Sequence, residues 1–221
     1  MSESSILILL GSALSIGFIH TLIGPDHYVP FIVISRARSW SMTRTVIVTI
    51  ICGMGHVLSS ILIGTVGIAA GSALAKLVAI ESVRGDIASY ILIGFGIIYG
   101  IWGLWRGRKG HGHIHLHGGK HLDASNARSV TFWTLFIIFV LGPCEPLIPL
   151  LMFPAVSQSW YVMLLVVTVF GSATIITMTA LVYAGVKGAS ALNTAFIERY
   201  VHAIAGAIIA FSGMAIRIFG I

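Results

Sequence analysis

Long apolar runs constrain this chain more than any other feature. Stretches of about 18 or more mostly apolar residues recur from end to end, and each could cross about 30 Å of hydrocarbon as a helix. The mean hydropathy is +1.00, and only 9% of the 221 residues are charged, against about 25% in soluble domains. The sequence therefore predicts an all-α polytopic membrane protein without a soluble domain, and its first partner is the lipid bilayer.

Six membrane-spanning segments are expected. Their approximate limits are 5–35, 43–70, 87–105, 130–156, 160–186 and 199–219. Residues 71–86 are expected to form a short helix lying in the membrane interface, because their apolar residues share one face while Lys76 and Arg84 lie off it. The first segment lacks the basic start and small-residue cleavage site of a signal peptide, so it is expected to be a true span.

Positive charge is concentrated in alternate loops. Most of the 13 Lys and Arg residues follow spans one, three and five: Arg36, Arg38, Arg44, Arg106, Arg108, Lys109, Lys120, Arg128, Lys187 and Arg199. An excess of Lys and Arg marks cytoplasmic loops. The sequence therefore predicts a multi-pass protein of the plasma (inner) membrane, with both termini outside and the loop 106–129 in the cytoplasm. The same distribution explains the pI of about 9.7 without nucleic acid as a partner.

The first span contains a stretch, residues 20–30, that is unusual for a helix in lipid. It holds two imidazoles, a carboxylate, a glycine and two prolines. Pro25 and Pro30 cannot donate to the carbonyls four residues earlier, and those carbonyls need a partner other than lipid. An ionisable residue at membrane depth costs about 2.5–3.5 kcal/mol and by default marks a functional site. Span one is therefore predicted to be a broken helix that lines a polar cavity.

The two halves of the chain resemble each other. Residues 22–30 of span one match residues 140–149 of span four, since both contain Gly-Pro, then a side chain that can bind metal (His27 or Glu145), then another proline. Three spans per repeat is an odd number, so the repeats would be inverted, with broken helices 1 and 4 meeting near the midplane. The expected organisation is a first three-helix repeat over 1–105, a histidine-rich loop over 106–129 and a second three-helix repeat over 130–221.

The central polar residues suit a divalent metal ion. Imidazole nitrogens and carboxylates bind borderline cations such as Ni²⁺, Co²⁺ or Zn²⁺, and the break at Pro25 would turn Asp26 and His27 inward. The candidate metal ligands are His20, Asp26, His27, His56, Glu145 and Cys144. Structural roles stay open for some of them. Asp26 could orient a ligand or cap a helix, His56 could simply bond between helices, and Cys144 could be a small buried residue.

A second histidine cluster lies between spans three and four. It comprises His111, His113, His115, His117 and His121. Alternating histidines with glycines form a flexible tract that can bind metal in an extended chain, and a solvated, pH-sensitive loop is the alternative. A cytoplasmic metal chaperone would be a suitable partner for such a loop. Because a cytoplasmic donor would load an inward-facing state, the loop slightly favours export over uptake.

These motifs resemble a known family. The Asp26-His27 pair beside Gly-Pro, the Gly-x-Gly-His of span two and the histidine-rich loop are similar to the nickel/cobalt transporter and urease-accessory UreH-like membrane family. That family belongs to the LysE-type superfamily, together with sulfite exporters and cytochrome-biogenesis thiol carriers. The resemblance implies that His20, Asp26, His27 and His56 match metal-selecting positions, and that nickel or cobalt is a transported substrate rather than a fixed cofactor. This sequence departs from the nickel-uptake signature, in which the first histidine lies closer to the Asp-His pair and there is no Gly-Pro.

Two other functions stay open. The Pro-Cys-Glu-Pro sequence at 143–146 looks like an element of the thiol-disulfide carriers, which need two partnering sulfurs, yet Cys52 lies at a different point of the repeat from Cys144. A sulfite-type anion exporter would use the basic loops. The sequence contains neither a Ser-His-Asp pattern nor a phosphate-binding loop, so we do not expect an enzyme. A homo-oligomer is compatible with the sequence.

Overall fold

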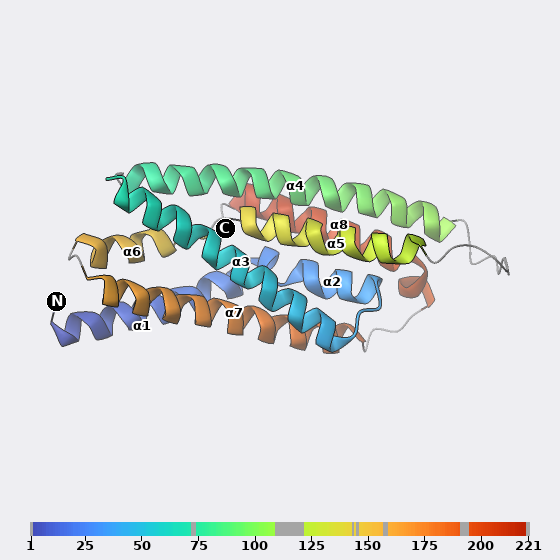
Figure 1. Cartoon of the computed structure of the whole chain (residues 1–221). Coiled ribbons are helices and arrows are strands. Elements are labelled where there is room, and N and C mark those ends of the chain that lie inside the picture. The colour runs from blue at the N-terminus through green and yellow to red at the C-terminus, as the bar shows by residue number, and fades with distance from the viewer. Residues whose placement is uncertain are drawn as a thin grey trace.

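The computed structural model describes residues 2–71, 74–108, 122–142, 144, 146–156, 159–190 and 195–219. Every regular element in these ranges is a helix. In chain order they are α1 (Glu3–Ile23), η1 (Pro25–His27), α2 (Val29–Ala37), α3 (Met42–Ala69), α4 (Leu74–Arg108), α5 (Leu122–Leu141), α6 (Leu147–Val156), α7 (Trp160–Ser190) and α8 (Ala195–Phe219). The helices lie along one long axis as an elongated bundle (Figure 1).

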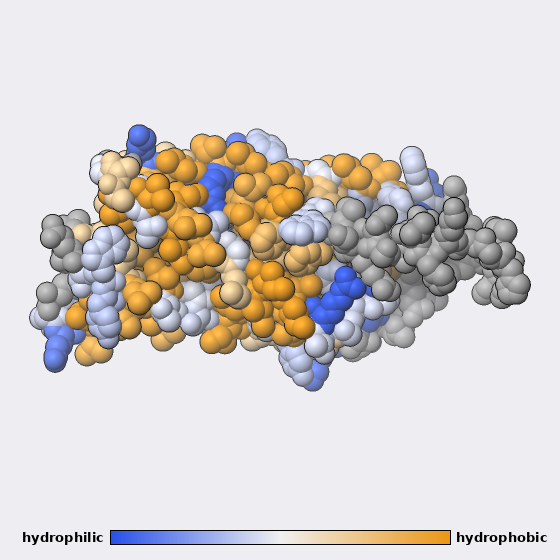
Figure 2. All heavy atoms as spheres, viewed as in Figure 1, coloured by the Kyte–Doolittle hydropathy of each residue, from blue (hydrophilic) through white to orange (hydrophobic). Residues whose placement is uncertain are grey.

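The bundle is built to sit in a membrane. Among the described residues, α1, α3, α4, α7 and α8 are long and apolar enough to cross a bilayer, whereas the apolar part of α5, Thr131–Leu141, is shorter. Large apolar side chains cover the flank of the bundle (Figure 2), and Leu7 and Ile98 are 70% and 71% exposed. The prediction of an all-α polytopic membrane protein is confirmed, while the count of six spans stays a prediction.

The predicted interface helix at 71–86 is wrong. From Leu74 onward this stretch is the beginning of α4, which continues without a break to Arg108 and is about 50 Å long at 1.5 Å per residue. Lys76 is exposed, but Arg84, the other charge that suggested an interface, is satisfied inside the bundle, because it pairs with Glu81, whose side chain is fully buried. A paired charge does not force its helix to the membrane surface.

The predicted break in the first span is present. α1 ends at Ile23, Gly24 adopts an extended conformation, and η1 begins at Pro25. Pro30 falls in the first turn of α2. Proline is tolerated there, because an N–H group in the first turn has no acceptor within the helix. Span four is broken in the same way, since α5 ends at Leu141 and α6 begins at Leu147. Each half of the chain therefore runs as a broken helix followed by two long helices.

Glycines bring α4 and α8 into close contact. A Cβ atom added to Gly206 on α8 would lie 2.6 Å from the Gly96 carbonyl oxygen and would also meet the backbone of Gly100. Such small residues let two helix backbones approach each other in a membrane. Gly96 and Gly100, four residues apart on α4, therefore form the face that packs against α8.

Two apolar clusters fill the bundle on either side of the histidines. One cluster contains Phe31 of α2 and Cys52 of α3, and the other contains Ala13 of α1 and has Ile61 of α3 packed against it. His20 and His27 lie between Ala13 and Phe31 along the chain, as His56 lies between Cys52 and Ile61. The three histidines therefore lie between two apolar parts of the core.

The basic residues gather toward one end of the bundle. The C-terminal ends of α2, α4 and α7 and the N-terminal ends of α3 and α8 lie in the same half (Figure 1). These ends carry Arg36, Arg38, Arg44, Arg106, Arg108, Lys187 and Arg199. The histidine-rich tract follows α4, but residues 109–121, with His111, His113, His115, His117 and His121, lie outside the described residues.

The α4–α8 contact generates a stability prediction. Gly206→Ala should destabilise the protein by about 1–3 kcal/mol, because its methyl group would overpack a backbone contact. Gly94→Ala is the matched control on α4, since nothing lies within 4 Å of a Cβ added there and Ala is the better helix former. Thermal unfolding in detergent measures both variants. An unchanged midpoint for Gly206→Ala would contradict the close packing.

Candidate metal centre

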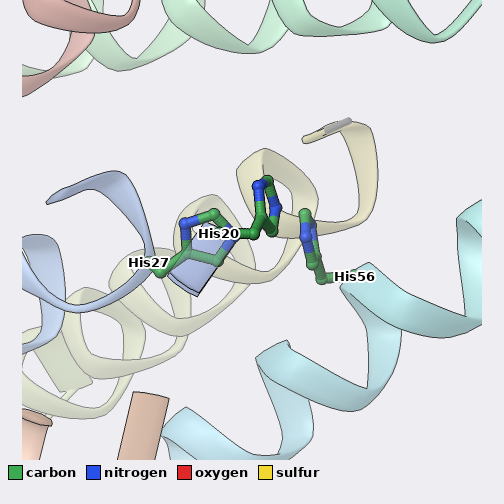
Figure 3. A group of neighbouring side chains, drawn as sticks. All are labelled: His20, His27 and His56. Carbon is green, nitrogen blue, oxygen red and sulfur yellow. The ribbon is translucent and has the colours of Figure 1, made fainter. Parts of the chain in front are cut away.

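Three histidines from three elements meet in the middle of the bundle. His20 comes from α1, His27 from η1 and His56 from α3, and their rings face one another (Figure 3). One ligand nitrogen from each lies within 4.8 Å of the others. The ring centroid of His27 lies 4.7 Å from that of His20 and 5.0 Å from that of His56. Nitrogens that each lie about 2.0–2.1 Å from one ion are at most about 4.2 Å apart, so the rings would close slightly around a metal.

The break in the first span creates this meeting. Seven residues along a continuous helix would separate His20 and His27 by about 10 Å, but the turn at Pro25 folds the second ring back onto the first. Gly24 leaves room for it, because a Cβ atom there would lie 2.6 Å from His27 Nδ1. Glycine and proline at these two positions therefore have a direct role in shaping the site.

Two of the rings are oriented through their Nδ1 atoms. His27 Nδ1 lies 3.2 Å from both the Gly24 carbonyl oxygen and Asp26 Oδ1, and His56 Nδ1 lies 3.2 Å from the Phe139 carbonyl oxygen. These acceptors favour the proton on Nδ1 and leave the lone pair on Nε2. Asp26 thus touches the site through His27.

The three Nε2 atoms have no hydrogen-bond partner among the described residues, and all three are buried. Burying a polar atom without a partner costs about 1–3 kcal/mol. Since two rings already use their protons at Nδ1, the Nε2 atoms of His27 and His56 cannot donate to each other. His27 and His56 therefore present unshared electron pairs beside the buried, unpartnered His20 Nε2, and such electron pairs are what a cation requires.

A cavity of about 500 Å³ adjoins the three histidines. Asp26 lines it beside the rings, Ile19 and Leu92 supply apolar wall, and Asp86 and Arg217 lie in its lining on α4 and α8. The last two form an ion pair, with Arg217 Nη1 3.1 Å from Asp86 Oδ1, and both side chains are about half exposed. A ligand can therefore approach the histidines from the side where α1 faces α4 and α8.

The structure does not place Cys144 in this group. Cys144 is fully buried in the apolar cluster around Leu147, Leu151 and Phe170, and it is not among the residues whose ligand atoms meet. Glu145 lies outside the described residues. The four predicted positions His20, Asp26, His27 and His56 thus come together, and Cys144 stands apart from them.

A buried ion pair on α4 was not predicted from the sequence. Glu81 and Arg84 of α4 pair with each other, and between them they contact α3, the end of α5 and the backbone N–H of Cys144. A signal for them was present, because an acid and a base three residues apart lie on one helix face, and ionisable residues at membrane depth mark functional sites. Assigning this stretch to the membrane surface hid that signal.

Comparison with known proteins gives one match. The family model described as cytochrome c biogenesis protein, transmembrane region, matches residues 30–215. No curated protein and no solved structure matches the chain. The matched residues include Cys52, His56 and Cys144, but they begin after His20, Asp26 and His27. Two of the three clustered histidines therefore lie outside the match.

Burial of both thiols generates a second prediction. Cys52 and Cys144 are free and fully buried, so a maleimide should label neither in the folded protein and both after unfolding in SDS. Ser4→Cys, on the exposed start of α1, is the matched positive control and should react in the folded state. Mass spectrometry counts the labels. Fast labelling of Cys144 in the folded protein would show that its thiol is accessible.

Proposed function

The chain belongs to the cytochrome c biogenesis protein transmembrane region family, and within that family we propose that it is a membrane carrier of a divalent transition-metal ion. The ion would bind at His20, His27 and His56. The observation that supports this proposal is the set of three buried Nε2 atoms without partners, gathered at a helix break.

The donor set favours particular metals. Imidazole nitrogens suit Ni²⁺, Co²⁺ and Zn²⁺ better than they suit Mg²⁺ or Ca²⁺, which prefer oxygen. We propose nickel or cobalt as the cargo, with zinc as the next choice. Because a histidine must lose its proton to bind, affinity should fall as the pH is lowered and protons compete for Nε2.

The proposed site suits a carrier better than a structural metal centre. Structural zinc sites close four protein ligands around the ion, whereas sites with three protein ligands keep a position open for exchange. Here three nitrogens adjoin a cavity through which an ion could enter or leave. Asp26 could assist entry, since its carboxylate is partly exposed and lines that cavity.

We propose that the two halves move as inverted repeats. In support, each half consists of a broken helix followed by two long helices, and transporters with such repeats bind their cargo at the breaks. The basic end of the bundle would face the cytoplasm and both termini the outside of the cell membrane. The histidine-rich loop would then supply metal on the cytoplasmic side, which slightly favours export.

Metal binding is the first test of this function. In a full-length parent variant with His111, His113, His115, His117 and His121 changed to Ala, we expect about one Co²⁺ per chain by elemental analysis and calorimetry. Adding His27→Ala should weaken Co²⁺ binding at least tenfold, because one of three ligands is lost. Binding by the parent should also weaken from pH 7.5 to pH 5.5.

His202→Ala is the matched control for this experiment. His202 is a partly buried histidine of α8 that bonds to the Tyr99 hydroxyl at 2.8 Å, away from the three clustered rings. Its loss should leave Co²⁺ affinity unchanged. If the parent variant binds none of Co²⁺, Ni²⁺ or Zn²⁺, the three histidines are not a metal site and the carrier proposal fails.

The family match favours a second candidate, a thiol-disulfide electron carrier. Such a carrier oxidises two thiols to a disulfide and passes two electrons on, so it needs two sulfurs that can meet. Cys52 and Cys144 are free and lie in different apolar clusters, so this function would require the two sulfurs to leave these clusters and meet. Anion export has less support, because Arg217, the one guanidinium among the described residues that line the cavity, is paired with Asp86.

Cys144→Ser separates the metal carrier from the electron carrier. If the protein carries metal, this variant should keep parental Co²⁺ affinity and parental Co²⁺ flux in proteoliposomes, because the thiol is packed away from the histidines. An electron carrier would lose all transfer of reducing equivalents across the vesicle membrane. Trapping of a mixed disulfide at Cys144, with no metal flux in the parent, would establish the second candidate.

A further inference from the structure

We propose that Glu81 and Arg84 are positioning residues, which hold the second helix break in place and thereby set the position of His56. The effect that this inference predicts on metal binding rests on the proposed function. The pair lies on α4, while the groups that it holds belong to α3, to the last turn of α5 and to the segment between α5 and α6.

Glu81 ties α4 to the break itself. Its side chain is fully buried, and besides its ion pair with Arg84 it accepts two hydrogen bonds at Oε2. One comes from Ser60 Oγ at 3.1 Å, and the other comes from the backbone N–H of Cys144 at 3.0 Å. That N–H lies outside α5 and α6, so in lipid it would otherwise lack an acceptor.

Arg84 ties α4 to the end of α5. Its Nη2 donates to the Val140 carbonyl oxygen at 2.7 Å and to the Gly142 carbonyl oxygen at 3.3 Å. The last carbonyls of a helix have no donor within the helix and carry partial negative charge. A guanidinium with several fixed donors satisfies both requirements at once.

The same network reaches His56 from two directions. The His56 ring is oriented by the carbonyl of Phe139, in the last turn of α5 and one residue before the carbonyl that Arg84 holds. The His56 backbone carbonyl accepts from Ser59 Oγ at 2.8 Å, and Ser59 Oγ in turn accepts from Arg84 Nη2 at 2.8 Å. A shift of the break would therefore move the group that aims His56 Nε2.

An ion pair suits this task better than a single charge or an apolar residue. A lone arginine near the histidines would repel a bound cation in a medium of low dielectric constant, and Glu81 cancels that charge. An apolar residue would leave the Cys144 N–H and the Val140 carbonyl without partners. At the first break, by contrast, the Gly24 carbonyl finds its partners within the break, in the backbone N–H and ring Nδ1 of His27.

The test uses a double substitution, because removing one charge would leave the other buried and uncompensated. Glu81→Met with Arg84→Met removes both, and replacing a buried pair by apolar residues often preserves the fold. Both changes are made in the full-length parent with the five loop histidines changed to Ala. Lys76→Met, at an exposed charge of the same helix, is the matched control.

We expect the double variant to unfold within a few degrees of the parent and to show two local changes. Amide hydrogen exchange over residues 140–147 should be at least tenfold faster, since the Cys144 N–H loses its acceptor. Co²⁺ affinity should fall at least tenfold, and the visible absorption of bound Co²⁺ should change because His56 is misplaced. Lys76→Met should match the parent in all measurements.

The remaining outcomes also decide whether the inference holds. Parental exchange together with a parental Co²⁺ spectrum in the folded double variant would overturn the inference. If the parent binds no Co²⁺, the proposed function fails, and the exchange rate alone then tests whether the pair holds the break. If the double variant does not fold, Arg84→Lys replaces it, because this substitution keeps the positive charge but loses the forked donors of the guanidinium. A hydrogen-exchange rate and a Co²⁺ spectrum equal to those of the parent in that variant would overturn the inference.

Discussion

Every backbone group in the hydrocarbon layer needs a partner, and this requirement shapes the whole structure. The chain interrupts two of its helices within the bundle, so each interruption exposes carbonyls and N–H groups that lipid cannot satisfy. At the first break His27 supplies the partners of the Gly24 carbonyl, through its backbone N–H and its ring Nδ1. At the second break α4 supplies the partners, through Glu81 and Arg84. Polar side chains at membrane depth are thus needed for the fold before any function is considered.

The candidate site follows from the first of these solutions. Because His27 Nδ1 bonds to the Gly24 carbonyl, its Nε2 is left to face the other two clustered rings (Figure 3). The hydrogen bond that orients the ring also favours the tautomer that a metal would need. One imidazole therefore belongs both to the first break and to the candidate metal centre, so a change of residue at this break would alter both.

The sequence was most informative where structure is local. The break at Gly24-Pro25 was predictable because proline removes a donor, and the approach of His20 to His27 follows from that break. The Glu81–Arg84 pair was not predictable in its role, because its partners lie on α3 and around residue 140, and nothing in the local pattern shows which helices meet. The same limit applies to Cys144, whose neighbours on α6 and α7 make it part of a dry cluster.

The family match and the site geometry describe different parts of the chain. The match starts at Pro30 and covers both cysteines, His56 and the Glu81–Arg84 pair, whereas His20 and His27 precede it. The matched region thus contributes the scaffold, the second break and one imidazole that faces the first break. Among the described residues, the imidazoles that cluster with His56 are His20 of α1 and His27 of η1. The candidate metal centre therefore depends chiefly on the N-terminal half of the first broken helix, where a few residues add imidazoles to the matched scaffold.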